Sequence, residues 1–74
     1  MKQAKLLHLL RQVRLEANLT QSQLAQKLGE SQPYVSKYET GEQRLDLLEI
    51  EKVCQATDTD LKTFIKKYLD ESKS

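Results

Sequence analysis

Apolar residues recur at intervals of three and four along most of the chain, which is the spacing of one face of an α-helix. No stretch alternates apolar and polar residues in strict period two, and the chain has only two Gly and one Pro. This pattern predicts an all-α fold whose helices are joined by short turns. The positions expected to face the core are Leu6, Leu10, Val13, Ala17, Leu24, Ala25, Leu28, Val35, Tyr38, Leu47, Ile50, Val53, Cys54, Leu61, Phe64, Ile65 and Tyr68.

Residues typical of helix ends separate these periodic segments. Thr20 and Gln23 have the spacing of a capping box, and Gly29 is suited to the left-handed conformation just after a helix. Pro33 is tolerated in the first turn of the next helix, behind Ser31 as the cap. The other expected caps and stops are Asn18, Gly41, Asp46 with Glu49, and Asp60. The predicted helices cover residues 3–17, 21–28, 32–40, 47–56 and a segment that begins after residue 60.

The length of 74 residues allows one compact domain. We expect this domain over residues 1–69 and a polar C-terminal tail over residues 70–74. The leucine-rich start of the chain is too short for a signal peptide or a membrane span.

The segment 20–41 has the layout of a helix-turn-helix unit, in which two short helices are joined by a turn that contains a glycine. Ala25 is small where the two helices meet, and Gly29 makes the turn. The small core between the helices is expected to consist of Leu24, Leu28, Val35 and Tyr38.

The stretch LTQSQLAQKLGESQPYVSKYETGEQRL, residues 19–45, resembles the phage-repressor and Cro-type helix-turn-helix family of transcriptional regulators, the XRE-like proteins. The resemblance extends from about Leu10 to Ile65. It implies a five-helix, lambda-repressor-like DNA-binding domain with the helix-turn-helix at helices 2 and 3. Two places depart from the family pattern: Glu30 stands where an apolar residue is frequent, and Thr57-Asp58-Thr59 lacks the usual glycine.

In this motif the second helix enters the major groove of DNA with its N-terminal residues near the base edges. If Val35, Tyr38 and Glu39 face inward, helical geometry turns Pro33, Lys37 and Thr40 outward and leaves the remaining residues on the flanks. A glutamine amide can both donate to and accept from adenine, and a lysine favours the acceptors of guanine. The predicted base-reading residues are therefore Gln32, Pro33, Ser36 and Lys37.

Contacts to the phosphate backbone are expected from Gln21, Tyr34, Thr40 and Arg44. Gln21 opens the second helix, where unpaired amides suit a phosphate. Tyr34 has packing as an equally good alternative. The resemblance further implies that Gln21 braces the base-reading Gln32, and that Arg14 and Glu39 form a buried ion pair.

Charge and cysteine content agree with an intracellular DNA-binding protein. The formal net charge is +1, but residues 1–45 hold seven Lys and Arg against four acidic residues, which suggests a phosphate-facing side. Cys54 is the single cysteine and His8 the single histidine, so neither an internal disulfide nor a tetrahedral metal site can form. We expect a cytoplasmic protein without metal or cofactor.

These observations predict a sequence-specific, double-stranded DNA-binding transcriptional regulator, namely a repressor encoded by a bacterium or phage and associated with the nucleoid. An enzyme is not expected, because the sequence offers no paired acids, no nucleophile with a base and no glycine-rich phosphate loop. Two alternatives use the same fold: an antitoxin that binds DNA and a toxin, or an adaptor that makes only protein contacts.

The protein is expected to act as a homodimer, at least on DNA, because one recognition helix reads only a few base pairs. Two such helices in successive major grooves require a near-palindromic operator. The expected dimer surface is the C-terminal helix through Phe64 and Tyr68, joined by Leu7. Phe64 and Ile65 could instead complete the core, as could Leu7 and Leu9.

Overall fold

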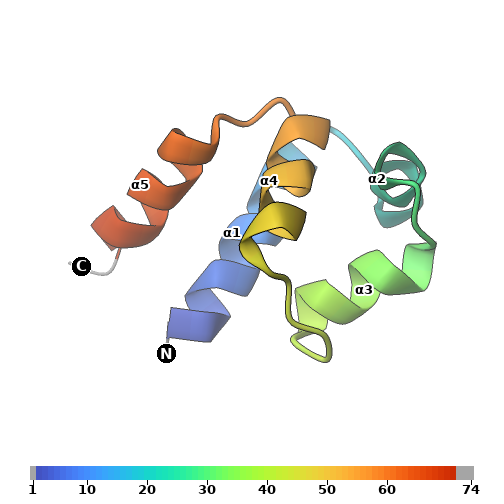
Figure 1. The fold of residues 1–74 in the computed structure, drawn as a ribbon, viewed down its shortest axis with the longest axis horizontal. Helices are drawn as coiled ribbons and strands as arrows, with labels where there is room; N and C mark the ends of the chain where they lie inside the picture. Colours follow the sequence, from blue (N-terminus) through green and yellow to red (C-terminus); the bar gives the residue numbers. More distant parts are fainter. Residues whose placement is uncertain (1, 72–74) are drawn as a thin grey trace.

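Five helices account for the part of the chain that the computed structural model describes, residues 2–71, with side chains described for residues 3–70. No strand occurs within this range, and the predicted all-α class is confirmed (Figure 1). In chain order the helices are α1 (Lys2–Glu16), α2 (Gln21–Leu28), α3 (Gln32–Thr40), α4 (Leu47–Ala56) and α5 (Leu61–Glu71).

The helix ends lie within a residue or two of the expected positions. Helix α5 continues to Glu71 and so includes the first two residues of the expected tail. The rest of that tail, residues 72–74, lies outside the described residues. None of the five helices is both long enough and apolar enough to cross a membrane.

Capping interactions explain where three of the helices begin, the third being α5, whose start is capped by the predicted Asp60 side chain. At the start of α2, the Thr20 hydroxyl accepts from the Gln23 amide at 3.1 Å, while the Gln23 side chain accepts from the Thr20 amide at 2.9 Å. The same reciprocal box joins Asp46 and Glu49 at the start of α4. These bonds satisfy amides that have no partner inside the helix, so each start is fixed locally.

Ser31 does not cap α3 with its side chain, contrary to the prediction. Its backbone is extended, as expected of a cap residue, but its hydroxyl makes no cap hydrogen bond. Pro33 lacks one of the two amides that such a side chain binds, and the amide of Tyr34 donates to the Ser31 carbonyl instead.

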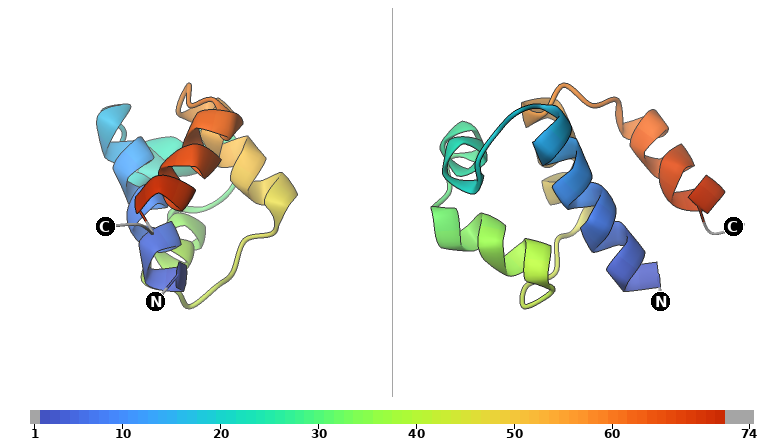
Figure 2. Two further views of the ribbon diagram at one scale, coloured as in Figure 1. Left: turned by 90° about the vertical axis from the view of Figure 1, so that its left-hand side faces the viewer. Right: turned by 180° about the vertical axis from the view of Figure 1, so that it is seen from behind.

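The hydrophobic core lies where α1 meets the other helices. Helix α1 runs between the α2–α3 pair on one side and α5 on the other, and α4 packs against α2 and α5 (Figures 1 and 2). Leu9 belongs to this core, which decides one of the alternatives left open by the sequence. The buried apolar residues are Leu9, Leu10, Val13, Leu24, Ala25, Val35, Tyr38, Val53, Cys54 and Phe64.

Two residues predicted to be inside are exposed. Leu47 is 63% exposed, because α4 packs through Val53 and Cys54 in its later turns and its first turn lies at the surface. Ile65 is 40% exposed, since α5 buries Phe64 and the next position is rotated by about 100° around the helix.

The structure removes one of the residues expected at the dimer surface. Phe64 is only 2% exposed and belongs to the core, so it cannot contact a second subunit. Leu7 is half-buried beside Gly41: a Cβ at that glycine would lie 3.0 Å from the Leu7 Cδ1 atom. Tyr68 is half-buried against the core.

A buried ion pair connects α1 with the end of α3. The Nε atom of Arg14 lies 2.7 Å from Oε2 of Glu39, and the two side chains are 8% and 4% exposed. A second bond joins Nη2 of Arg14 to Oε1 of Glu39 at 3.1 Å, so the contact is bidentate.

A tyrosine connects α3 with α4. The hydroxyl of Tyr34 donates to Oε2 of Glu49 at 3.0 Å, and its ring packs edge-on against the ring of Tyr38, with centroids 5.7 Å apart. Burial, followed by the hydrogen bond and negative charge of Glu49, raises the pKa of Tyr34 to about 12. Burial also raises the pKa of Tyr38.

We predict that Arg14→Ala lowers the free energy of unfolding by about 3–5 kcal/mol, because it leaves the buried Glu39 carboxylate without its cation. Urea denaturation measures this loss. Arg11→Ala is the matched control, since Arg11 is exposed on the same helix and its removal should change the stability by less than about 0.5 kcal/mol. The double variant Arg14→Met/Glu39→Leu, which removes both charges, should recover most of the loss. Similar values for Arg14→Ala and Arg11→Ala would show that the pair does not stabilise the fold.

We predict that the protein loses stability as the pH rises from 10 to 12. In this interval the unfolded chain loses the Tyr34 proton at the ordinary pKa of 10.0, while the folded protein retains it up to about 12. Proton loss then favours the unfolded state. The free energy of unfolding of Tyr34→Phe should therefore fall less steeply across this range than that of the unchanged protein. Equal slopes would show that folding does not raise the pKa of Tyr34.

Candidate nucleic-acid interface

The predicted base-reading side of α3 lies at the surface. Gln32, Pro33 and Lys37 are exposed, and Ser36 is half-buried beside them. Val35 and Tyr38, on the opposite side of the helix, are fully buried. Helix α3 therefore has one side held in the core and one side available to a partner, as its helical periodicity predicted.

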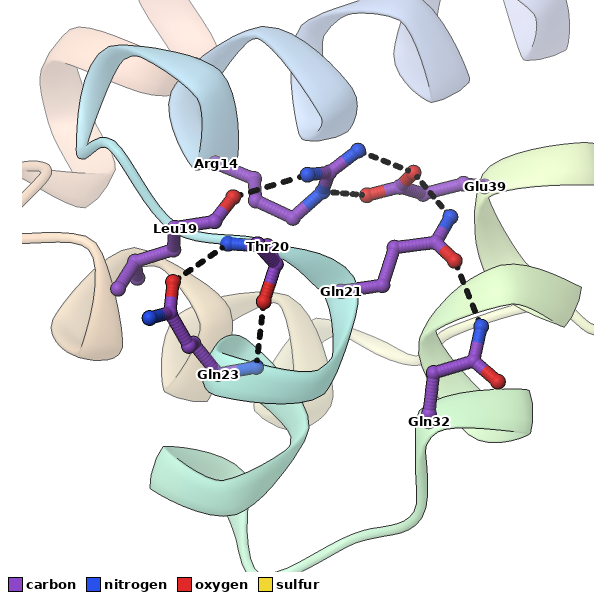
Figure 3. A network of polar contacts seen from close by, with 7 residues as sticks. All are labelled: Arg14, Leu19, Thr20, Gln21, Gln23, Gln32 and Glu39. Atoms are coloured by element: carbon purple, nitrogen blue, oxygen red, sulfur yellow. Dashed lines mark hydrogen bonds and ion pairs between the residues drawn. The ribbon is translucent and has the colours of Figure 1, made fainter.

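A continuous chain of hydrogen bonds runs from the buried ion pair to this exposed side (Figure 3). Nε2 of Gln21 donates to Oε1 of Glu39 at 3.0 Å. Nε2 of Gln32 then donates to Oε1 of Gln21 at 2.7 Å. The structure thus brings together four of the predicted site residues, Arg14, Glu39, Gln21 and Gln32, from three different helices.

Each member of this chain fixes the orientation of the next. Glu39 can only accept, so Gln21 must turn its amide nitrogen towards Glu39 and its oxygen towards α3. Gln32 consequently donates one amide hydrogen to Gln21 and keeps its other N–H and its Oε1 unused within the described residues. One donor and one acceptor on a single amide are what the major-groove edge of adenine matches.

The Arg14 guanidinium is held from two sides. Besides its two bonds to Glu39, it donates from Nη1 to the carbonyl of Leu19 at 2.9 Å (Figure 3). Leu19 precedes the Thr20 cap, so the start of α2 is tied to the same cation. Sequence reasoning missed this bond, because no residue type signals which backbone carbonyl a distant arginine will reach.

The predicted phosphate contacts occupy different settings. Gln21 is the first residue of α2 and its side chain belongs to the hydrogen-bond chain, while Arg44 is exposed in the loop between α3 and α4. Thr40 donates its hydroxyl hydrogen to the Lys37 carbonyl at 3.1 Å. Of the predicted phosphate contacts, only Arg44 has a charged side chain, and it is exposed to solvent.

Of the two roles expected for Tyr34, the structure contains the packing contact. Its hydroxyl hydrogen is donated to Glu49, and a phosphate at this position would lie beside that carboxylate and be repelled. Glu49 thus accepts a hydrogen bond from Tyr34 in addition to taking part in the capping box at the start of α4. The capping pattern revealed Glu49 in the sequence, but its contact with Tyr34 depends on how α3 and α4 pack.

No group of three potential metal-ligating side chains comes together among the described residues. Burial raises the pKa of the Cys54 thiol to about 11, so this side chain is protonated at neutral pH and is a poor nucleophile.

Comparison with known proteins places this geometry in a family. A model of the helix-turn-helix family matches residues 10–64. An XRE-family like protein from Pseudomonas syringae pv. tomato str. DC3000 has a solved structure that is 37% identical, with a TM-score of 0.88 over 95% of this chain and 85% of that one. A comparison with curated protein sequences gives no significant match.

A more distant structure supports the fold alone. The wild-type restriction-modification controller protein C.Esp1396I is 22% identical, with a TM-score of 0.89 over 100% of this chain and 97% of that one. The family match, however, covers most of the sequence and includes every residue of the hydrogen-bond chain from Arg14 to Glu39. This chain belongs to the XRE family of helix-turn-helix DNA-binding proteins.

Proposed function

We propose that the protein is a sequence-specific transcriptional repressor that reads operator DNA in the major groove through α3. The observation that carries this proposal is the orientation of Gln32, which is fixed by Gln21 at the exposed start of the helix. A side chain held in one orientation reads a base with less loss of conformational entropy than a mobile one. Repression requires nothing beyond occupancy, since a protein bound in the groove excludes others from the operator.

Gln32 and Lys37 are the main base-reading residues in this proposal, with adenine and guanine as their respective targets. Pro33 lies beside Gln32 and offers an apolar surface to a thymine methyl group. Ser36 is half-buried and can reach only a base edge or sugar close to the helix.

Arg44 and the N-terminus of α2 at Gln21 supply the phosphate contacts. The free amides of α2 and its positive helix end favour an anion, and the exposed guanidinium of Arg44 adds a charge that does not depend on the base sequence. Thr40 joins these contacts only if its hydroxyl exchanges the Lys37 carbonyl for a phosphate oxygen.

The protein acts as a homodimer on a near-palindromic operator, and it does so in the cytoplasm of a bacterial cell. The dimer surface we propose is the exposed apolar side of α5, where Ile65 is 40% and Leu69 is 56% exposed. The two residues are four positions apart and therefore adjacent on one helix face. An operator read in two successive major grooves requires the two α3 helices of the dimer to lie about 34 Å apart, one helical turn of DNA.

We predict that Gln32→Ala and Lys37→Ala each weaken binding to the selected operator by about 1–3 kcal/mol and relax base preference at separate positions. Arg44→Ala should weaken binding to all duplexes more evenly and reduce the salt dependence. Selection from a random duplex pool, followed by titration, measures both effects. Lys62→Ala is the matched control, because Lys62 is exposed on α5.

If the operator and its affinity were unchanged in Gln32→Ala and Lys37→Ala, α3 would not be the reading helix. If the unchanged protein bound no duplex even at low salt, the adaptor alternative would replace the repressor.

We predict that Ile65→Asp reduces affinity for the full operator to the level of a half-operator, because a charge would be buried in the apolar dimer contact. Lys66→Asp, a neighbouring exposed position on α5, is the control for added negative charge. Sedimentation of the free proteins and titration onto full and half operators give the stoichiometry. One protein per full operator, with the same affinity as for the half site, would exclude the dimer.

A further inference from the structure

A pocket of about 260 Å³ lies between α1, the loop that joins α3 to α4, and α5. None of the base-reading residues borders it. Its wall is largely apolar and is formed by Leu6, Leu7, Leu10, Leu45 and Tyr68. Ligand sites usually combine such a wall with a few polar groups that fix the ligand. The volume is just below the range typical of drug-sized ligands, so a smaller molecule is indicated.

One hydrogen-bond donor without a partner belongs to a residue that borders the pocket, and a second lies over the ring of the lining residue Tyr68. The side chain of Tyr38 borders the pocket, and its buried hydroxyl has no hydrogen-bond partner among the described residues. The Lys5 ammonium group is likewise buried without an acceptor in this part of the chain, 5.6 Å from the ring centroid of Tyr68. Buried donors in native proteins nearly always find an acceptor, so the unpartnered Tyr38 hydroxyl at the pocket calls for an explanation.

Among the residues that line the pocket, the charged side chain is that of Arg44, so the pocket carries positive charge alone. Arg44 borders the pocket, is exposed, and forms no ion pair within residues 3–70. No acidic residue lines the pocket; its other polar lining residues are Gln3 and Gln43. An occupant that supplies acceptor atoms and a negative charge would therefore complement both the Arg44 guanidinium and the unpartnered Tyr38 hydroxyl.

We propose that this pocket binds a small organic anion with an apolar body, of the type of a medium-chain carboxylate. The alkyl chain lies against Leu6, Leu10 and Leu45, and the carboxylate accepts from Arg44. This occupant fits better than a side chain from a second copy of the protein. The exposed apolar residues proposed for the dimer, Ile65 and Leu69, do not border the pocket.

The position of the pocket couples its occupant to DNA binding, a step that rests on the proposed function. Arg44 borders the pocket and is also the proposed phosphate contact, so a bound carboxylate competes with the DNA backbone for one guanidinium. Leu7, which lines the pocket, also lies beside Gly41 at the end of α3, where an added Cβ would meet it at 3.0 Å. The ligand should therefore weaken DNA binding, and DNA should weaken ligand binding by the same factor.

The first test uses the full chain without DNA, octanoate as the probe and octanol as its neutral counterpart. NMR titration should show shift changes centred on Leu6, Leu7, Leu45 and Tyr68, with octanoate bound about threefold to tenfold more tightly than octanol. Arg44→Gln should abolish this difference, while Lys62→Gln, a charge-matched change outside the pocket, should preserve it.

Tyr38→Phe provides an independent measurement. Removal of an unpartnered buried hydroxyl should raise the Tm of the ligand-free protein. The further increase in Tm that octanoate produces should be smaller than in the unchanged protein, because one donor is lost. A lower Tm for Tyr38→Phe would show that the hydroxyl has a partner in the folded chain and would remove this support.

Three results would overturn the proposal. They are the absence of shift changes at millimolar octanoate, equal affinity for octanoate and octanol, and shift changes at the pocket that follow protein concentration without ligand. The last would mean that a second copy fills the pocket.

A final titration asks whether octanoate releases operator DNA. Ligand binding without any DNA binding would reject the repressor and leave the pocket assignment intact.

Discussion

The buried pair of Arg14 and Glu39 is the contact on which the arrangement of the first three helices depends. Two charges removed from water are tolerated only when each is neutralised and hydrogen-bonded, and here the guanidinium satisfies both carboxylate oxygens and one backbone carbonyl. The requirement is geometric as well as energetic. Helix α1, the turn before α2 and the end of α3 must all lie within hydrogen-bond distance of one cation. A shift of α1 or α3 leaves a charge unpaired, and a shift of the turn leaves a guanidinium N–H without its acceptor.

The same pair also fixes a side chain on the exposed side of α3. Glu39 also accepts from Gln21, and Gln21 accepts from Gln32, so the orientation of an exposed amide is set by a charge in the interior. A carboxylate that only accepts and a guanidinium that only donates allow no ambiguity in the direction of the bonds between them. The orientation of this exposed amide thus follows from the polarity of the core, and a change in the ion pair would alter both the folding stability and the orientation of Gln32, the proposed base-reading residue.

The sequence was sufficient to predict contacts between residues close together in the chain, but not how the helices pack against one another. The capping boxes at Thr20 and Asp46 and the glycine turn at Gly29 involve residues only a few positions apart, so their spacing is sufficient to predict them. The Arg14–Glu39 pair and the Gln21–Gln32 bond were expected from the family resemblance, since residues this far apart carry no local signal. The exposure of Leu47 and Ile65 and the bond from Tyr34 to Glu49 depend on how far one helix overlaps another. Hydrophobic periodicity indicates the face of a helix but not the length of its contact.

The two ends of α3 are held by different contacts, and this difference bears on the ligand effect that we propose. Its start is fixed by Gln21, whereas its end passes through Gly41 into a loop that borders the pocket beside α1 and α5. A ligand in this pocket would act on the loop and on Arg44, while Gln32 would stay held by its own partners. Such an effector would change the affinity of the protein for the DNA backbone and leave its base preference intact. Under the proposed function, this separation would allow one small domain to keep a single operator sequence while its occupancy of that operator responds to a small organic anion.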